Sequence, residues 1–419
     1  MFARRHFYTV LTAALLFAAT PVCAVELDVA GMPLTLSGYG DLRMVTSPKM
    51  DSWLDGGLGK FRYGGKGGNF RFAEGVVQAQ LDINDTVSAV TLLRAEPKQR
   101  SGVDALEAYV SLHPQSDGNV SWSAKLGAFF PTISLENDDI GWTSPYTLTP
   151  SAINTWIGEE LRTIGTEGTA RWRTDNVGTF SLTGALFGSN DQAGVLIADR
   201  GWTMHDRATG LFEKVRQPDA TLRLRRQTPP GRTGEFSEID HRAGWYAGLA
   251  WQMPGIGKLT ALRYDNQGDP TIARGGVYAW TTKFWNFGAR TQVGDLVLIS
   301  QYLAGFTSIK LAGMAEMVTK FQSGFLLASY DLRSWDMPDF RASIRGDVFQ
   351  TRRIAAAPHV QSEDGNAVTA ALSWQKYEWL KLTGEMVLMH SRRREYTLVG
   401  VPSGELGQSE IQFDAKFFF

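Results

Sequence analysis

The sequence lacks several features that would assign it to a common class of protein. It contains a single cysteine, Cys23, so disulfides within the chain and thiolate metal sites are excluded. Basic and acidic residues nearly balance, with a formal net charge of −1, whereas nucleic-acid-binding domains are usually basic. After Ala24 there is no run of about eighteen apolar residues, which excludes a transmembrane helix of ordinary length.

Enzyme motifs are also missing. There is no G-x-S-x-G, H-E-x-x-H or P-loop sequence. Among the six histidines, His205 alone is followed by an aspartate, Asp206, and we interpret this pair as solvated in a loop. We therefore expect a protein that is not an enzyme and that has no cofactor and no metal site.

The first 24 residues predict a secretory signal peptide. Arg4 and Arg5 precede an apolar stretch at 10–19, which is too short to span a bilayer as a helix. We expect cleavage after Ala24. A lipoprotein site at Cys23 is the alternative, but valine precedes this cysteine where Gly, Ala or Ser is preferred. Cleavage removes two of the 42 Lys and Arg residues and no acid, which leaves 40 basic against 43 acidic residues.

Period-two alternation of apolar and polar residues recurs along the rest of the chain. From 340 to 348, Phe, Ala, Ile, Gly and Val alternate with Arg, Ser, Arg and Asp, and 34–44 and 120–129 follow the same rule. Alternation of this kind places one set of side chains on each face of a β-strand. A soluble sandwich would show the same local pattern. The charged second face, the predicted signal peptide and the loop lengths favour a membrane barrel.

About sixteen such segments can be counted. They start near Pro33, Phe70, Val87, Val103, Val120, Thr163, Thr179, Ala243, Lys258, Tyr278, Leu296, Lys320, Phe340, Asn366, Leu380 and Gln408. Short turns alternate with longer loops near 46–69, 96–102, 130–162, 189–242, 266–277, 306–319, 350–365 and 391–407. Outer-membrane barrels have short periplasmic turns and long external loops. We predict an all-β, antiparallel transmembrane barrel spanning 25–419 as one domain. Thr221–Arg225, in the longest loop, could form a hairpin arm, so eighteen strands is the alternative.

Aromatic residues mark the ends of these segments. Those near segment ends are Trp122, Trp172, Trp245, Trp251, Tyr264, Trp285, Tyr330 and Trp374. They predict girdles at the membrane interfaces, although ordinary core aromatics are an alternative. The final segment alternates as well, with apolar Ile411, Phe413, Ala415, Phe417 and Phe419 on one face.

The layout and the terminal Phe strand resemble the Gram-negative porins with about sixteen strands, although no single porin is matched. The resemblance implies an outer-membrane location, contact with outer-membrane lipid, and recognition of Phe413, Phe417 and Phe419 by the barrel assembly machinery. It also implies a homotrimer and passive diffusion of small hydrophilic solutes or ions. A structural or adhesive barrel with a filled lumen remains the alternative function.

In such porins the third external loop folds into the barrel and narrows it. The corresponding loop here, 130–162, is long and acidic, with Glu136, Asp138, Asp139, Glu159 and Glu160. Long loops in compact folds are usually functional, so this loop is our candidate constriction. A solvated surface loop is the alternative.

The polar faces of the strands are rich in arginine. The arginines expected to point into the lumen are Arg43, Arg71, Arg94, Arg171, Arg173, Arg263, Arg290, Arg341 and Arg345. A charge facing lipid at mid-depth costs about 2–4 kcal/mol, which favours the inward direction. Acids share these faces: Asp41, Asp82, Glu107, Glu167, Asp347 and Glu385. A basic wall opposite an acidic loop predicts a mild preference for anions or carboxylates, carried by Arg43, Arg71 and Arg94. Alternatively, each arginine pairs with an acid and only stiffens the wall.

Overall fold

The computed structural model describes residues 24–46, 48–65, 70–219, 231–313, 315–354, 361–394 and 403–419. Most of the predicted signal peptide lies outside these ranges, so cleavage after Ala24 stays a prediction. Within the described residues, no helix has both the length and the apolar character needed to cross a membrane.

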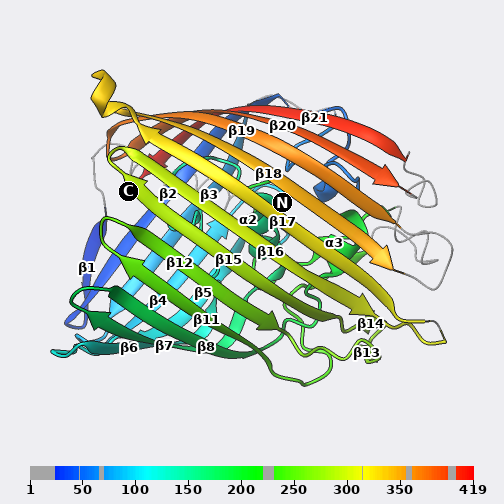
Figure 1. The fold of residues 1–419 in the computed structure, drawn as a ribbon, viewed down its shortest axis with the longest axis horizontal. Coiled ribbons are helices and arrows are strands. Elements are labelled where there is room, and N and C mark those ends of the chain that lie inside the picture. Colours follow the sequence, from blue (N-terminus) through cyan, green and yellow to red (C-terminus); the bar gives the residue numbers. More distant parts are fainter. Residues whose placement is uncertain are drawn as a thin grey trace, which may run out of the picture.

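Sixteen antiparallel strands form a closed barrel (Figure 1). They are β2 (Met32–Thr46), β3 (Phe70–Asp82), β4 (Val87–Ala95), β5 (Val103–Leu112), β6 (Val120–Phe129), β7 (Thr163–Thr174), β8 (Gly178–Gly188), β11 (Gly244–Met253), β12 (Gly257–Asp265), β15 (Thr281–Val293), β16 (Leu296–Ile309), β17 (Met317–Asp331), β18 (Phe340–Ile354), β19 (Ser362–Tyr377), β20 (Leu380–Arg394) and β21 (Gly404–Phe418). Pairing of β2 with β21 closes the ring. The predicted fold class is confirmed.

Among the described residues, five further short strands stay outside the ring. β1 (Val25–Val29) folds back on β2. In the longest loop, β9 (Val215–Arg216) and β10 (Arg232–Thr233) pair only with each other, as β13 (Ala273–Arg274) and β14 (Val277–Tyr278) do in the next loop. The alternative of eighteen strands is therefore wrong for the described part of the chain. Thr221–Arg225, on which it rested, lies outside the described residues.

The two ends of the barrel differ as predicted, with short turns at one end and long loops at the other. At the short-turn end, 294–295 connects β15 to β16 in two residues, and Gly294 has the positive φ of +59° that such a turn requires. The next connection holds a 3-10 helix, η3 (Leu332–Trp335). Strand β19 continues through Tyr377, so its turn to β20 lies at 378–379.

The outer face of the barrel is apolar at the depth of the membrane. Ile344 and Val348 on β18 are 55% and 62% exposed, which only a lipid-facing position explains for such residues. The outward Trp122, Trp172 and Trp285 are also exposed, in agreement with the predicted girdles. Tyr264 does not belong to them, because its side chain is buried inside the barrel.

Arg263 was also placed on the wrong face. Its neighbours on β12, Leu262 and Tyr264, are both buried and point inward. Because side chains alternate along a strand, Arg263 points to the opposite face. Arg263 therefore lies on the outside, with its guanidinium 5.4 Å from the centre of the exposed Trp285 ring. This cation–π contact with Trp285 stabilises the outward guanidinium of Arg263 near the long-loop end of the wall.

The interior of the barrel has two unlike halves. The inner faces of β8, β11, β12 and β15–β17 are apolar: Phe187, Tyr246, Leu262, Tyr264, Phe284, Ile299, Leu303, Phe321, Phe325 and Leu327. The inner faces of β2–β4 and β18–β21 are charged: Asp41, Arg43, Glu74, Arg94, Arg345, Asp347, Glu363, Glu385, Arg393, Glu410, Asp414 and Lys416. The expectation of a polar inner wall is therefore confirmed for one half only.

Phe419 takes part in closing the barrel. Its backbone N–H donates to the carbonyl of Gly38 over 3.1 Å, and the N–H of Gly38 donates back over 3.0 Å. A Cβ on Gly38 would come within 2.7 Å of the Phe419 ring, so the two residues are closely packed.

Deleting Phe419 should lower the yield of folded barrel, because it removes two hydrogen bonds and a ring at the closing seam. The yield is measured as the heat-modifiable band on gels of unboiled membranes. Replacing Phe287, an exposed residue of β15 away from the closing seam, with Leu is the matched control and should fold normally. Normal folding without Phe419 would contradict the assembly prediction.

Candidate functional site

External loops 3 (130–162) and 4 (189–243) both enter the barrel. Loop 3 carries α2 (Ala152–Glu160) and loop 4 carries α3 (Val195–Arg200), and every residue of both helices is buried. Figure 1 shows both helices inside the ring of strands. Ser151 starts α2, since its Oγ accepts the N–H of Asn154 at 3.2 Å. The entry of loop 3 is the feature expected of a constriction.

The loops pack against the apolar half of the wall like a hydrophobic core. The ring of Trp156 on α2 lies 5.4 Å from Phe284, 5.0 Å from Phe321 and 6.0 Å from Trp202 of loop 4. Large aromatic residues in such clusters dominate packing energetics. The loops are therefore anchored elements and not solvated surface segments.

Glu136 of loop 3 joins the charged half of the wall. Its carboxylate accepts the N–H of Ser151 at 2.6 Å and lies 3.5 Å from Arg345 on β18. Arg345 also pairs with Asp347 at 2.8 Å and donates to the carbonyl of Thr149 at 2.7 Å. Since all of these groups are buried, loop 3 is fixed to the wall by a buried ion pair and by hydrogen bonds.

Glu159 and Glu160 connect loop 3 to loop 4. Glu159 pairs with Arg200, and it lies 3.0 Å from Nε2 of His205. Burial alone would raise the pKa of Glu159, but Arg200 and His205 outweigh it and lower the pKa to about 2. Glu160 accepts the N–H groups of Gly194 and Ile197 at the start of α3. Burial raises the pKa of Glu160 to about 8.

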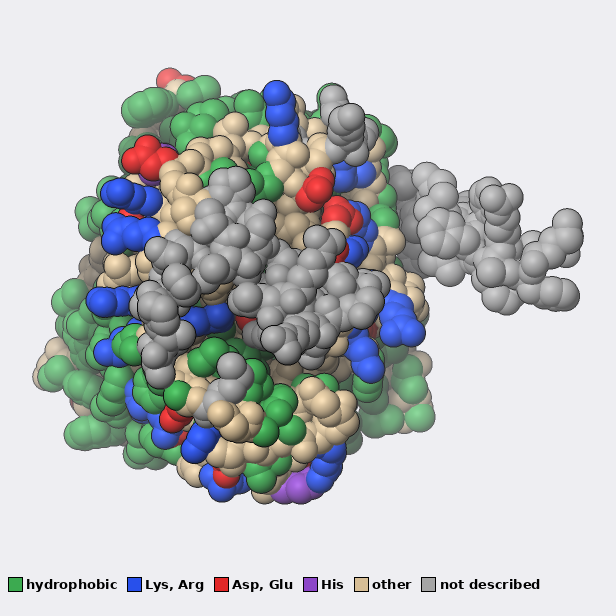
Figure 2. All heavy atoms as spheres, turned by 90° about the vertical axis from the view of Figure 1, so that its right-hand side faces the viewer, with side chains coloured by type: hydrophobic (Ala, Val, Ile, Leu, Met, Phe, Trp, Pro, Cys, Tyr) green, Lys and Arg blue, Asp and Glu red, His purple; other side chains and the backbone are tan. Residues whose placement is uncertain are grey.

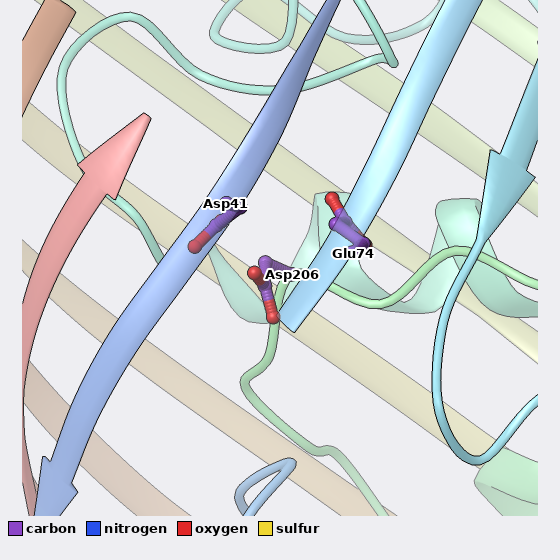
Figure 3. A group of neighbouring side chains, drawn as sticks. All are labelled: Asp41, Glu74 and Asp206. Atoms are coloured by element: carbon purple, nitrogen blue, oxygen red, sulfur yellow. The ribbon is translucent and has the colours of Figure 1, made fainter. Parts of the chain in front are cut away.

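A cluster of opposite charges fastens loop 4 to the other side of the lumen. Asp206 lies 2.6 Å from Arg43 of β2 and 3.0 Å from Arg62 of loop 1, the external loop between β2 and β3. Asp41 pairs with Arg43, and Glu74 accepts the Tyr39 hydroxyl at 2.8 Å. Figure 3 shows Asp206 reaching from loop 4 to the strands that carry Asp41 and Glu74.

The three carboxylates of this cluster, Asp41, Glu74 and Asp206, have oxygens within 4.8 Å of one another, as in a cation site. The guanidinium groups of Arg43 and Arg62 already lie among these carboxylates and supply two positive charges to them. Burial alone would raise the pKa of Asp206, but the two arginines outweigh it and hold the pKa well below its usual range. Asp206 is therefore ionised at any working pH.

Further contacts hold loop 4 along its length. Arg94 of β4 donates to the carbonyl of Ala208 and lies 3.5 Å from Glu213. Lys60 of loop 1 donates to the carbonyl of Trp202 at 2.7 Å and pairs with Glu363 of β19 at 2.6 Å. Residues 190–210 are all buried apart from Asp206, which is partly so.

The sequence-based interpretation of His205 and Asp206 as a solvated pair was wrong. Both side chains are enclosed within the barrel. Asp206 pairs with Arg43, and Nε2 of His205 lies 3.0 Å from the Glu159 carboxylate. The length of loop 4 was the available signal, because long loops without strands are uncommon unless they are functional. Their partners cannot be read from the sequence, since Arg43 lies more than 160 positions away.

Closer to the short-turn end, the interior is open to water. Inward-facing Arg171 and Arg173 of β7 are exposed, and Arg171 donates to Ser123 at 2.9 Å. Other partly exposed inward cations are Lys125, Lys258, Arg290, Arg341 and Lys381, while the wall acids at this level are Asp82, Glu107 and Asp331. We call this space the lower chamber. Cations outnumber acids on its wall.

The remaining candidates lie apart from the buried networks. Asp138 and Asp139 of loop 3 are exposed, and Asp138 pairs with Arg290 at 2.6 Å on the lower-chamber side. Arg71 faces inward with its guanidinium 4.4 Å from the centre of the Tyr63 ring. The predicted site residues therefore fall into two groups. One group takes part in the buried contacts of loops 3 and 4, and the other lies in the lower chamber.

Solved structures share this fold. The outer-membrane channel DcaP of Acinetobacter baumannii has a TM-score of 0.54 at 10% identity, over 95% of this chain and 100% of that chain. The anion-selective porin from Comamonas acidovorans has a TM-score of 0.51 at 13% identity, over 93% and 100%. OmpF of Salmonella typhi, in complex with daunomycin, has a TM-score of 0.51 at 14% identity, over 94% and 100%. No family model matches the chain, and no curated protein matches it in sequence.

The fold and the surface agree on the location of the protein. A closed barrel satisfies its backbone hydrogen bonds internally, which a membrane-spanning chain requires, and its exposed apolar belt suits lipid. The chain is a multi-pass β-barrel of the Gram-negative outer membrane with the fold of porins.

Replacing Asp206 with Asn should release loop 4. Removing one partner of a buried ion pair costs up to roughly 3–5 kcal/mol. Arg43 and Arg62 keep Asp41 and Glu96 as partners, but loop 4 loses the carboxylate that binds it to both arginines. We expect more frequent or larger openings in planar bilayers. Asp269→Asn, which loses an exposed loop pair with Arg242, is the control. Unchanged currents in both variants would show that Asp206 does not hold the loop.

The raised pKa of Glu160 predicts a pH dependence of the contact between loops 3 and 4. The packed loops favour the neutral carboxyl of Glu160. The stabilisation that this group gives to the contact between the loops is therefore complete below the ordinary pKa of 4.5, and it is lost as pH rises to about 8. Openings should be more frequent at pH 9 than at pH 5. Glu160→Gln, which stays neutral, should remove this dependence, and an identical pH profile in the variant would disprove the assignment.

Proposed function

We propose that the protein is a porin, through which small hydrophilic solutes and ions diffuse passively across the outer membrane. The observation that supports this most strongly is the lower chamber, where inward Arg171 and Arg173 meet water inside the barrel. A barrel of about sixteen strands is wide enough to enclose an aqueous path. The experiment that tests the proposal is the current through a planar bilayer containing purified, folded protein. Stepwise ohmic openings are expected.

Loops 3 and 4 form the narrowest part of the proposed path. Glu136, Glu159 and Glu160 act there as anchors of the constriction, since each is held by a buried donor or cation. Conduction then requires the charged contacts of loop 4 to rearrange, because residues 190–210 occupy the lumen beside α2. The proposed channel is therefore one whose openings depend on loop movement.

The proposed selectivity is a mild preference for anions or carboxylate-bearing solutes. In the lower chamber Lys258 and Arg290 lie directly opposite each other on β12 and β15, and both face the lumen. Exposed guanidinium groups can bind carboxylates bidentately, whereas Arg43 and Arg94 are already engaged in buried contacts. We therefore assign the preference mainly to Arg171 and Arg173, with a smaller share from Arg290 and Arg341, which also pair with Asp138 and Asp331. The role of Arg43, Arg71 and Arg94 in selectivity stays a prediction.

Assembly and chemistry follow from the same proposal. We expect a homotrimer in outer-membrane lipid, folded by the barrel assembly machinery and seen as a heat-modifiable oligomer on gels. We propose no catalytic activity, because His205 is enclosed and its ring nitrogen meets Glu159. No nucleic-acid partner is proposed for a chain of balanced charge.

A structural or adhesive barrel is the second candidate. The aromatic packing of α2 and the buried ion pairs of loop 4 support it, since a lumen filled in this way need not open. The bilayer experiment separates the two candidates. Verified folded protein that carries no current, both as wild type and as the Asp206→Asn variant, would favour the structural barrel.

Changing Arg171, Arg173 and Arg290 together to Gln should reduce the anion preference. We expect the anion-to-cation permeability ratio, obtained from the reversal potential in a salt gradient, to fall about twofold or more. The matched control changes the exposed loop residues Arg232, Arg242 and Arg274 to Gln, with the same loss of charge. If both variants keep the wild-type reversal potential, the lower chamber does not set selectivity.

A further inference from the structure

A row of polar side chains crosses the inner wall of the lower chamber on strands β7, β8, β11, β12 and β15. Its members are Arg173, Thr179, Gln252, Lys258 and Arg290, which lie directly opposite one another from each strand to the next. All five face the lumen, and none is buried. The first four lie one residue from a strand end that adjoins a short turn, so this polar row borders the short-turn mouth of the barrel.

The polar row is basic and has no acid beside it on the wall. The five strands are fully described, and Glu167 is the only acid at an inward position on them. Its carboxylate lies further toward the long loops, where it accepts the hydroxyls of Thr132 and Tyr246 at 2.8 and 2.6 Å. By contrast, acidic and basic side chains are mixed at the long-loop end (Figure 2). The polar row therefore favours an anion at the short-turn mouth.

The cations of the polar row lack a full set of acidic partners. Lys258 and Arg290 lie directly opposite each other, and like charges in that position are destabilising. Asp138 of loop 3 pairs with Arg290 at 2.6 Å. Within the described part of the chain, no carboxylate lies within ion-pair distance of Lys258 or of Arg173. A carboxylate bound between Lys258 and Arg290 would relieve their repulsion.

Neutral hydrogen-bonding groups fill the positions between the cations. The hydroxyl of Thr179 and the amide of Gln252 lie between Arg173 and Lys258 in the row. Among the described residues, neither side chain makes a hydrogen bond, so both are available to a solute in the chamber. Neighbouring strands are about 4.8 Å apart, so about 14 Å separates Arg173 from Lys258 along the row. This length exceeds that of a carboxylate and suits a solute that also carries hydroxyl groups.

We propose that the polar row binds a sugar acid, that is, a carbohydrate that carries a carboxylate. This inference rests on the proposed porin function, because the sugar acid would be one of the permeating solutes. The carboxylate lies between Lys258 and Arg290, whose cationic groups suit its oxygens. The sugar hydroxyls exchange hydrogen bonds with Gln252 and Thr179. The row holds no aromatic ring against which a sugar could pack, so the carboxylate is the main anchor.

The test compares three solutes. D-galacturonate carries both kinds of group, galactose has the ring hydroxyls without the carboxylate, and propionate has a carboxylate without the sugar. Titrations followed by saturation-transfer NMR of the detergent-solubilised full chain measure the affinity for each solute, and heat-modifiability on gels verifies folding. The wild type should bind galacturonate at least about threefold more tightly than either other solute, because only galacturonate uses the cations and the neutral groups together.

Two variants separate the two kinds of contact. Lys258→Gln should weaken binding of galacturonate and of propionate at least about threefold, since it removes one of the two cations that hold the carboxylate. Its affinity for galactose should not change. Gln252→Leu should weaken binding of galacturonate and leave binding of propionate unchanged, since it removes only an amide that meets the hydroxyls.

Each variant has a matched control. Lys283→Gln removes a cation from the outer face of β15, where its ammonium pairs with Asp265 at 3.0 Å. Gln292→Leu removes an exposed amide at the next inward position of β15 after Arg290, outside the polar row. Both controls should bind galacturonate as the wild type does.

Three outcomes would overturn the proposal. Equal binding of galactose would show a site for neutral sugars, and equal binding of propionate would show that charge alone acts. Unchanged binding of galacturonate by Gln252→Leu would show that the amide takes no part. Because these titrations need no current, failure here leaves the porin proposal to the bilayer experiment, and a lack of current would not alter the binding result.

Discussion

Closure of the backbone hydrogen-bond ladder between β2 and β21 is the constraint from which the rest of the structure follows. In lipid, an unpaired N–H or C=O costs several kcal/mol, so the sheet has no free edge and must form a ring. Closure divides every strand into an outward and an inward set of side chains. The outward set meets lipid, and the inward set must be covered by water or by protein.

The protein uses both kinds of cover. On the apolar half of the wall, Phe284 and Phe321 would be exposed to water if the lumen were empty, and Trp156 of loop 3 covers them. At the short-turn end, Arg171 and Arg173 are left to water. The position of the loops is therefore set by the distribution of apolar side chains on the inner wall, and the hydrated volume is what remains.

The charged half of the wall adds specificity to that packing. Asp206 joins two arginines from different segments, and Arg345 joins Glu136 to the strand that carries Asp347. Buried ion pairs are expensive to desolvate and add little net stability, yet losing one partner is costly. Such contacts hold the loops in one arrangement while leaving that arrangement sensitive to a single charge. In the proposed channel, loop 4 is therefore the part that moves.

The sequence by itself determined the strands and their faces. Starts such as Phe70, Val87 and Leu296 agree with the structure because period-two alternation depends only on neighbouring residues. The same local rule failed at two neighbouring residues of β12. Tyr264, an aromatic residue with a polar tip, points into the barrel, and Arg263, a cation near the rim, points outward. The 296–309 segment is apolar on both faces. Its apolar inward face indicated, from the local sequence, that protein covers this part of the interior.

What only the tertiary structure decided is which charges meet. Arg43 and Arg94 lie on lumen-facing positions as the sequence predicts, but their engagement by Asp206 and Ala208 depends on how loop 4 folds across the barrel. The position of Gln252 beside Lys258 on the inner wall likewise depends on the register between β11 and β12. Local sequence patterns set the direction of a side chain, because direction follows from the strand period. Its partners are set by contacts between distant segments, which only the closed barrel brings together.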